Sequence, residues 1–394
     1  MKIIQYWVIL TIYTVIFSSC SMEGENELSR PEGTCDTLRL YPNKSEEISI
    51  KEIIKQTKFI PLETHEEGLI GMIHCIKYFN GKFFIHDETK VTVFDHQGRF
   101  LGNLGSLGRG PEEYTSCDEF IIDKFNGHLI ISNHLTGRDL IYFDSTLKFL
   151  YKKRYNENVE SILPMKDESY CLYFGNRFQE EHDHYIKLTD TNFETKDNLI
   201  PKSDEIDHSI SQIFHGTYLY KGEVNVVPMF SNTVYRVDLN GVRPRYYFDF
   251  GDYSIDQAFL KSTEVLSSRD QFRAIKKAKY VYSTDRFIET NNWLHFTYSS
   301  GTEGLHFVFY NKKTGKIYDS QGFRDTPALG ITSLPYGQKG ESVIYTVDPF
   351  LLTGKGEAAL SFQKHVLPKS GELMTLKQQT TFSSNPILVL GELK

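Results

Sequence analysis

The sequence predicts an all-β fold, a β-propeller of six four-stranded blades. Aromatic residues make up 14% of the chain, and Phe and Tyr supply most of them. They fall in short alternating segments bounded by Gly, Asn and Asp, a pattern typical of strands. These segments recur as similar units about every 40 to 70 residues, the range of propeller blades with loop insertions. Because a β-sandwich does not repeat its turns in this way, we expect a ring of similar sheets.

The first residues are typical of a secretory leader. Lys2 is the only charge before an apolar run over residues 3–17. That run is shorter than the roughly 20 residues needed to span a bilayer. Small residues then precede Cys20 in the tetrad FSSC, which resembles the bacterial lipobox, although Phe17 replaces the more usual aliphatic residue. The resemblance implies a lipoprotein signal peptide over residues 1–19 and lipidation of Cys20. A retained membrane anchor is the alternative.

The next segment, residues 20–45, is polar and rich in Glu, so we expect a lipidated tether. Acidic residues directly after the cysteine resemble signals that send some bacterial lipoproteins to the cell surface, although a solvated linker explains them equally well. We therefore expect an exported protein, lipid-anchored to the bacterial outer membrane on its periplasmic or cell-surface side. The propeller domain is predicted over residues 46–394.

Five units align directly as two strands followed by a turn that Asp or Asn begins. The turns begin at Asp95, Asp144, Asp190, Asp238 and Asn311. Such side chains can accept hydrogen bonds from the local backbone. A sixth unit is less regular, with one strand over residues 343–348 and another near the C-terminus. We expect the strand predicted over residues 48–62 to pair with that C-terminal strand, which closes the ring and removes an exposed edge.

One segment interrupts the strand pattern between the fourth and fifth units. Residues 254–282 can place apolar side chains on one side of a helix and charged ones on the other. The apolar set is Ala258, Leu260, Val265, Phe272 and Ile275. We expect a helical insertion against one face of the ring, either as structural cover or as part of a binding site.

From residue 48 onward the chain resembles the six-bladed β-propeller lipoproteins of Bacteroidetes-type bacteria, which are similar to NHL-repeat propellers. The resemblance rests on TKFIPLET, on the first unit with its GRGPEEY element, and on the ending NPILVLGELK. GRGPEEY is similar to the usual GxGPGEY, with Glu112 where Gly is common. The resemblance implies a propeller fold, and members of this family mostly lack an assigned activity.

The most distinctive loop is GSLGRGPEEY, residues 105–114. It lacks the GK[ST] ending of a phosphate-binding loop. Arg109, Glu113 and Tyr114 are candidate ligand-binding residues. The alternative is a connection between blades in which Arg109 and Glu113 hydrogen-bond the neighbouring backbone.

A second candidate lies in QEEHDHY, residues 179–185. His182 and His184 share one face of an extended segment and have acidic neighbours, so they could bind Zn²⁺ or another divalent metal. A solvated polar turn is the alternative. No other cofactor is predicted. The remaining cysteines, Cys35, Cys75, Cys117 and Cys171, show no CxxC spacing, and we expect small buried hydrophobes rather than disulfides or a zinc site.

Composition restricts the function classes. A net charge of -7 and a pI near 6.0 argue against a nucleic-acid partner. No HExxH or GxSxG motif is present. We therefore expect a monomeric binding or scaffolding module for a peptide, a glycan or an envelope protein. The alternative is a hydrolase or lyase with its site at the central channel. A channel lined by His with Asp or Glu would favour chemistry, and aromatic and small polar residues would favour binding.

Overall fold

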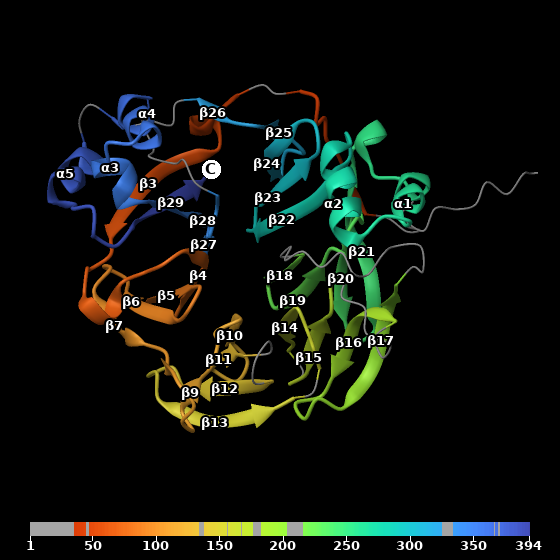
Figure 1. Cartoon of the computed structure of the whole chain (residues 1–394), viewed down its shortest axis with the longest axis horizontal. Coiled ribbons are helices and arrows are strands. Elements are labelled where there is room, and N and C mark those ends of the chain that lie inside the picture. Colours follow the sequence, from red (N-terminus) through yellow and green to blue (C-terminus); the bar gives the residue numbers. More distant parts are fainter. Residues whose placement is uncertain are drawn as a thin grey trace, which may run out of the picture.

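A computed structural model describes residues 35–44, 47–133, 138–155, 157–166, 168–175, 183–202, 216–324, 334–365, 367–368 and 371–394. Cys20 and the rest of the predicted leader lie outside this range. Most described elements are strands, so the predicted all-β class is confirmed. Figure 1 shows sheets arranged around a centre, a propeller-like fold.

The sheets are built from four-stranded units, numbered here in chain order, in which consecutive strands pair antiparallel. Unit 1 contains β4 (Ile73–Phe79), β5 (Lys82–Asp87), β6 (Val91–Asp95) and β7 (Phe100–Asn103). Unit 2 contains β10 (Glu119–Asp123), β11 (His128–Ser132), β12 (Asp139–Phe143) and β13 (Phe149–Arg154). Unit 3 contains β14 (Ser161–Pro164), β15 (Tyr170–Tyr173), β16 (His184–Thr189) and β17 (Thr195–Pro201). In each unit the first strand lies nearest the centre (Figure 1).

The second half of the chain continues this order. Unit 4 contains β18 (Thr217–Tyr220), β19 (Glu223–Val226), β20 (Thr233–Asp238) and β21 (Gly241–Asp249). Unit 5 contains β22 (Val281–Glu289), β23 (Trp293–Ser300), β24 (Gly304–Asn311) and β25 (Ile317–Ser320). The last sheet combines both ends of the described chain, in the order β27 (Gly337–Lys339), β28 (Ser342–Val347), β29 (Ile387–Leu393) and β3 (Ile54–Pro61). We call it unit 6, and its β27 also pairs in parallel with β4 of unit 1.

The predicted strand over residues 48–62 is divided in the structure. β2 (Ile48–Ser49) pairs in parallel with β26 (Phe323–Arg324), and a 3-10 helix, η1 (Ile50–Glu52), follows. Only β3 pairs with β29, antiparallel, from Ile54↔Leu393 to Pro61↔Ile387. The break buries Ile50 and Ile53, which are 0% exposed, against the last unit. Three further short strands are β1 (Asp36–Arg39), β8 (Ser106–Leu107) and β9 (Glu113–Tyr114).

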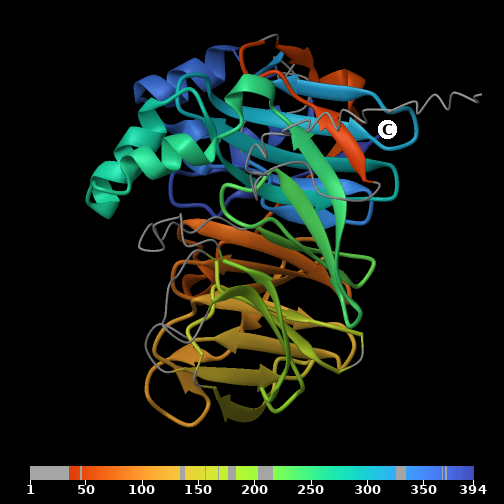
Figure 2. The ribbon, with the colours of Figure 1, turned by 90° about the vertical axis from the view of Figure 1, so that its right-hand side faces the viewer.

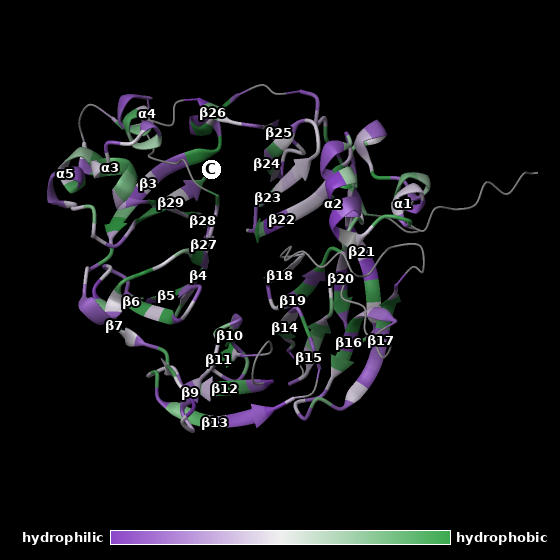
Figure 3. Ribbon diagram, viewed as in Figure 1, coloured by the Kyte–Doolittle hydropathy of each residue, from purple (hydrophilic) through white to green (hydrophobic). Residues whose placement is uncertain are grey.

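The apolar core lies between neighbouring sheets. Strands in the middle of each unit are buried on both faces, as in β5 and β6, and Figure 3 shows apolar residues along them. One cluster combines Phe84 and Val93 of unit 1 with Phe120 and Leu129 of unit 2. Corresponding clusters join units 2 and 3, 3 and 4, 4 and 5, 5 and 6, and 6 and 1. Burial between sheets therefore holds each unit against both of its neighbours.

The predicted turns form as expected after the third strand of each of the first five units. In each of them a side-chain Oδ1 accepts backbone N–H groups two to four residues later. The first N–H···O distances are 2.8 Å at Asp95, 2.8 Å at Asp144, 2.7 Å at Asp190, 2.8 Å at Asp238 and 3.1 Å at Asn311. This recurring hydrogen bond is the physical basis of the repeat that the sequence shows.

The predicted helical insertion is present as two helices, α1 (Gln257–Thr263) and α2 (Ser268–Lys277). A 3-10 turn, η3 (Gly251–Tyr253), precedes them. Leu260 and Ile275 are buried in a cluster with Ile255 and Phe230, and Phe272 packs against it. The prediction is wrong for the other two residues of the apolar face, since Ala258 is exposed and Val265 is 91% exposed. The chain leaves the helix between α1 and α2, so one helical period does not extend through both.

Three helices not predicted from the sequence lie between β28 and β29. They are α3 (Pro349–Thr353), α4 (Glu357–His365) and α5 (Glu372–Gln379), and a 3-10 turn, η2 (Glu66–Gly68), follows β3. Asp348 caps α3 by accepting the Phe350 N–H at 2.7 Å. Figure 2 shows α1, α2 and these helices on one side of the sheets. Within the described residues, no helix is long and apolar enough to cross a membrane.

Candidate functional site

The candidate site is a central cavity of about 670 Å³ lined by the first strands of all six units. β4, β10, β14, β18, β22 and β27 each contribute, so residues far apart in the sequence share one space. The inner strands surround the centre in Figure 1. A cavity of this size falls in the range of small-ligand sites, which are usually built where several elements meet.

We call one end of this cavity the hairpin end, because the inner strands turn there into the second strands. Lys124 lies in the turn after β10, Lys221 in the turn after β18, and Lys339 at the end of β27. The turns approach one another: a Cβ placed on Gly222 would lie 2.9 Å from Lys166 Cε and 3.2 Å from Phe125 Cζ. Hairpins of units 2, 3 and 4 therefore meet at this end.

Aromatic rings support the lysines that line the cavity. The Nζ of Lys339 lies 4.3 Å from the centre of the Tyr78 ring, and that of Lys221 lies 5.2 Å from the Tyr220 ring. Lys77 Nζ lies 5.6 Å from the Phe120 ring and donates to the Phe120 carbonyl at 2.5 Å. Such cation–π contacts favour defined ammonium positions while leaving N–H donors available.

Glu119 is the cavity carboxylate with the most perturbed titration. Its two oxygens accept Ser161 Oγ–H at 2.6 Å and Ile162 N–H at 3.0 Å, which joins units 2 and 3. Loss of hydration raises the pKa of Glu119 to about 7, against the opposing effect of Lys77 and of these hydrogen bonds. The cavity therefore contains a carboxyl group that changes charge near neutral pH.

Glu289, at the end of β22, is fully buried in a charged network between units 4 and 5. Its Oε1 accepts Tyr246 O–H at 2.8 Å and pairs with Arg245 at 2.8 Å and Lys312 at 3.0 Å. Its Oε2 accepts Tyr218 O–H at 3.0 Å. Burial, followed by the adjacent carboxylate, raises the pKa of both tyrosines well above its usual value. Groups of the protein itself thus satisfy both the charge and the hydrogen bonds of Glu289, which stabilises this side of the cavity.

The opposite end of the cavity contains His74, Cys75 and His86. His86 Nε2 lies 2.9 Å from the Cys117 carbonyl oxygen, and burial lowers the pKa of His86 to about 4. Burial also raises the pKa of Cys75, which opposes a reactive thiolate. Across the described ranges, no group of three or more His, Cys, Asp or Glu is arranged to hold a metal ion. This end thus presents a neutral imidazole and a protonated thiol.

The loop over residues 105–114 lies away from the central cavity, as a connection between units 1 and 2. β8 and β9 pair within it, and Glu113 Oε2 accepts Gly110 N–H at 2.7 Å. Tyr114 is 1% exposed, and burial raises the pKa of its phenol. Neither Arg109, Glu113 nor Tyr114 lines the cavity. Their assignment as ligand contacts stays a prediction.

Only one of the two predicted metal ligands, His184, lies within the described residues. His182 lies outside the described residues. His184 begins β16, and its Nδ1 lies 2.6 Å from Asp183 Oδ1. A metal bound by this pair stays a prediction. No disulfide joins Cys35, Cys75, Cys117 and Cys171. Cys171 is buried, as expected, whereas Cys75 is partly exposed.

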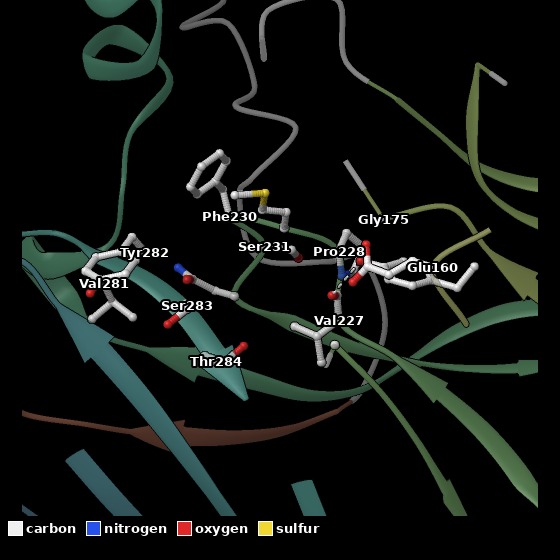
Figure 4. Close-up of a pocket in the computed structure, with 14 residues that line it drawn as sticks. Glu160, Gly175, Val227, Pro228, Phe230, Ser231, Val281, Tyr282, Ser283 and Thr284 are labelled. Carbon is white, nitrogen blue, oxygen red and sulfur yellow. Dashed lines mark hydrogen bonds between the residues drawn. The ribbon is translucent and has the colours of Figure 1, made fainter. Parts of the chain in front are cut away.

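A second cavity lies between unit 3, the segment that joins β19 to β20 in unit 4, and β22 of unit 5 (Figure 4). Glu160, Pro228, Phe230 and Thr284 are among its lining residues. Its volume is about 30 Å³, enough for one or two water molecules. The central cavity is therefore the better candidate for a ligand.

The lysines of the hairpin end were not predicted as site residues from the sequence. Lys-Gly-Glu occurs at the end of the inner strand at residues 221–223 and 339–341, but also at 355–357, between α3 and α4, so the motif alone did not identify the site. Glycine suits the positive φ of the turn, +76° at Gly222 and +59° at Gly340. Lys221 has a positive φ as well, +51°, so at this position the residue also takes part in forming the turn.

The sheets and their central cavity define a propeller-like all-β protein. The chain belongs to the family described as a domain of unknown function, DUF4934, which matches residues 36–392. No match is found among curated proteins.

One solved structure has the same overall fold. The chain is similar to a "putative exported protein" from Bacteroides fragilis NCTC 9343, at 19% identity and a TM-score of 0.78, over 91% of this chain and 99% of that one. Weaker similarity links it to a protein of unknown function from Bacteroides caccae, at 11% identity and a TM-score of 0.39, over 63% and 81% of the two chains. The Neurospora crassa Pan2 WD40 domain matches at 10% identity and a TM-score of 0.37, over 77% and 82%.

Proposed function

We propose that this protein is a non-enzymatic binding module that takes its ligand into the central cavity. The observation that carries the proposal is the cavity itself: about 670 Å³, lined by six inner strands, with polar side chains, aromatic rings and lysines together. Those features suit recognition of a polar peptide or glycan segment, or of a small polar ligand. The lining also includes His74, His86, Asp118 and Glu119, the pattern expected for chemistry. Burial keeps His86 neutral and Cys75 protonated, however, which favours binding.

The proposal includes a six-bladed propeller closed by the pairing of β3 with β29. Six units of four strands, each packed on its neighbours, support that architecture. In this arrangement the last blade combines strands from both ends of the chain, which leaves no open sheet edge at the junction. A rigid ring of this kind holds the cavity walls at fixed positions without a ligand.

The proposal also places the protein outside the cytoplasm, attached by a lipid on Cys20. The support is the leader-like start of the sequence. Cys20→Ser should release the protein from the membrane fraction of the native host, whereas Cys35→Ser should leave its distribution unchanged. Equal membrane association of the wild type and Cys20→Ser would contradict lipid anchoring.

Leu219→Trp tests binding in the cavity. Leu219 lines the cavity from β18 and is 37% exposed, so a larger side chain there fills space without entering the core. Envelope glycans and peptides that raise the melting temperature of the wild type should have no effect on this variant. Leu239→Trp, at an exposed turn beyond β20, serves as the control. Ligands that stabilise Leu219→Trp and the wild type equally would contradict the proposed site.

A hydrolase or lyase is the second candidate, and Glu119 is the observation that favours it. A cavity carboxyl group with a pKa of about 7 can exchange a proton near neutral pH. Turnover of a ligand by the wild type, lost in Glu119→Gln while binding persists, would establish this alternative. Binding without turnover would favour the binding module.

A further inference from the structure

We propose that the hairpin end of the central cavity recognises a small ligand carrying several carboxylate or equivalent oxyanion groups. This inference rests on the proposed binding function and adds the chemistry of the ligand. Its basis is the placement of Lys77, Lys124, Lys221 and Lys339 among the residues that line this cavity, with Lys124, Lys221 and Lys339 at its hairpin end. Among the described residues, no Asp or Glu forms an ion pair with any of these four ammonium groups.

The acidic residues of the cavity do not neutralise this end. Glu289 is paired with Arg245 and Lys312, so its charge is balanced within this network, in which Arg245 also pairs with Glu223. Glu119 bonds to Ser161 and the backbone of β14. Glu341, the remaining acid near the hairpins, accepts the Asn291 side-chain amide at 2.8 Å. Lys77 interacts with Glu119, so Lys124, Lys221 and Lys339 are the ammonium groups that an entering anion meets without a paired carboxylate.

The sign of this end opposes that of the whole protein. The chain has 51 acidic and 44 basic residues, so a cluster of lysines is not a consequence of composition. Placing like charges together in a cavity is unfavourable unless a counter-charge binds. A cavity with walls of low dielectric also concentrates the field, which strengthens attraction for anions.

The ammonium groups are also held in position. Lys339 lies over Tyr78, Lys221 over Tyr220 and Lys77 over Phe120. These contacts occupy ring faces that could otherwise stack on a sugar, so recognition at this end depends on charge and hydrogen bonds. Lysines fixed before binding lose less side-chain entropy when an oxyanion arrives.

Two matched pairs of probes test the inference by calorimetry. Tetragalacturonate is compared with its full methyl ester, which keeps the size but removes the charges, and tetraglutamate is compared with tetraglutamine. We expect at least one acidic probe to bind and its neutral partner not to bind, with affinity falling as salt increases. The acid that binds distinguishes a glycan from a peptide source.

Variants then locate the site. Lys124→Gln, Lys221→Gln and Lys339→Gln should each weaken binding of the acidic probe about tenfold, the usual effect of losing one charge-assisted hydrogen bond. Lys58→Gln, on the exposed face of β3, is the matched control and should have no effect. Because all three variants change hairpin residues, unchanged melting temperatures verify that they fold.

The outcomes separate this inference from the proposed function. If the neutral probes bind as tightly as the acids and Leu219→Trp abolishes that binding, the cavity is a binding site but the anion inference is wrong. Unchanged binding of the acids by the triple lysine variant would also overturn it. If no acidic probe binds at millimolar concentration and low salt, the inference fails as well, while the screen with Leu219→Trp still decides the proposed function.

Discussion

Glu289 offers the sharpest test of how the ring is stabilised beside its cavity. The Glu289→Gln substitution keeps the shape of the side chain and removes its charge. The carboxylate is 0% exposed and contacts two cations and two tyrosine hydroxyls. Removing one partner of a buried ion pair typically costs about 3 to 5 kcal/mol, because the other charge stays buried without compensation.

The contacts that Arg245 and Lys312 keep place the expected loss of stability near the lower end of this range. Arg245 keeps a second contact with Glu223 at 3.1 Å, and Lys312 keeps the Tyr220 hydroxyl at 3.2 Å. Both cations are also 17% exposed, so water partly compensates them. We therefore expect Glu289→Gln to lower the free energy of unfolding by about 3 kcal/mol.

Urea unfolding at neutral pH, followed by tryptophan fluorescence, measures this loss, since Trp293 is buried in the adjacent core. Tyr246→Phe should have a smaller effect, about 1.5 kcal/mol, because it removes one hydrogen bond to the same carboxylate. Glu52→Gln is the control: its pair with Lys316 is about half exposed. A midpoint for Glu289→Gln equal to that of Glu52→Gln would refute the reasoning.

Three further predictions concern single groups. The raised pKa of Glu119, about 7 against a usual 4.5, means that the folded protein binds its proton more tightly than the unfolded chain. The stabilisation that Glu119 gives the folded protein is then present below pH 4.5 and is lost as the pH rises to 7. The difference in melting temperature between the wild type and Glu119→Gln should therefore decrease over that interval. A constant difference would contradict the raised pKa. Gly98→Ala should destabilise more than Gly127→Ala, because both have positive φ but only the Cβ at Gly98 would meet Pro61 O, at 2.3 Å. Equal midpoints in urea would show that β3 yields at this contact. Asp144→Ala removes backbone hydrogen bonds from an exposed turn and should cost about 1 kcal/mol, with Asp252→Ala as an exposed control.

Part of the fold could be predicted because its cause is local. An Asp or Asn side chain that accepts backbone N–H groups within four residues specifies a turn wherever it recurs, as Asp95 and Asn311 show. The helical insertion was predicted for the same reason, from apolar spacing. The prediction was wrong at Val265, because the chain turns between α1 and α2 and the helical period restarts.

The candidate site was harder to predict, because its residues have no relation in sequence. Arg109, Glu113 and Tyr114 were predicted as ligand contacts because they lie in a glycine-rich loop. In the structure this loop connects two sheets. The lysines of the cavity lie in ordinary hairpins, far apart along the chain. Lys221 and Lys339 both precede glycine, but so does Lys355, which does not line the cavity.

The sequence by itself determined the all-β class, the repeated turns and the position of the helical insertion. These depend on periodicity, side-chain hydrogen bonds and propensities that act over a few residues. Tertiary structure decided which strands face the centre, how β3 meets β29, and which charges share a cavity. Those features depend on burial between sheets and on contacts between residues far apart in the sequence. Glu119 on β10 meets Ser161 on β14, 42 residues later, and Ile54 on β3 pairs with Leu393 on β29.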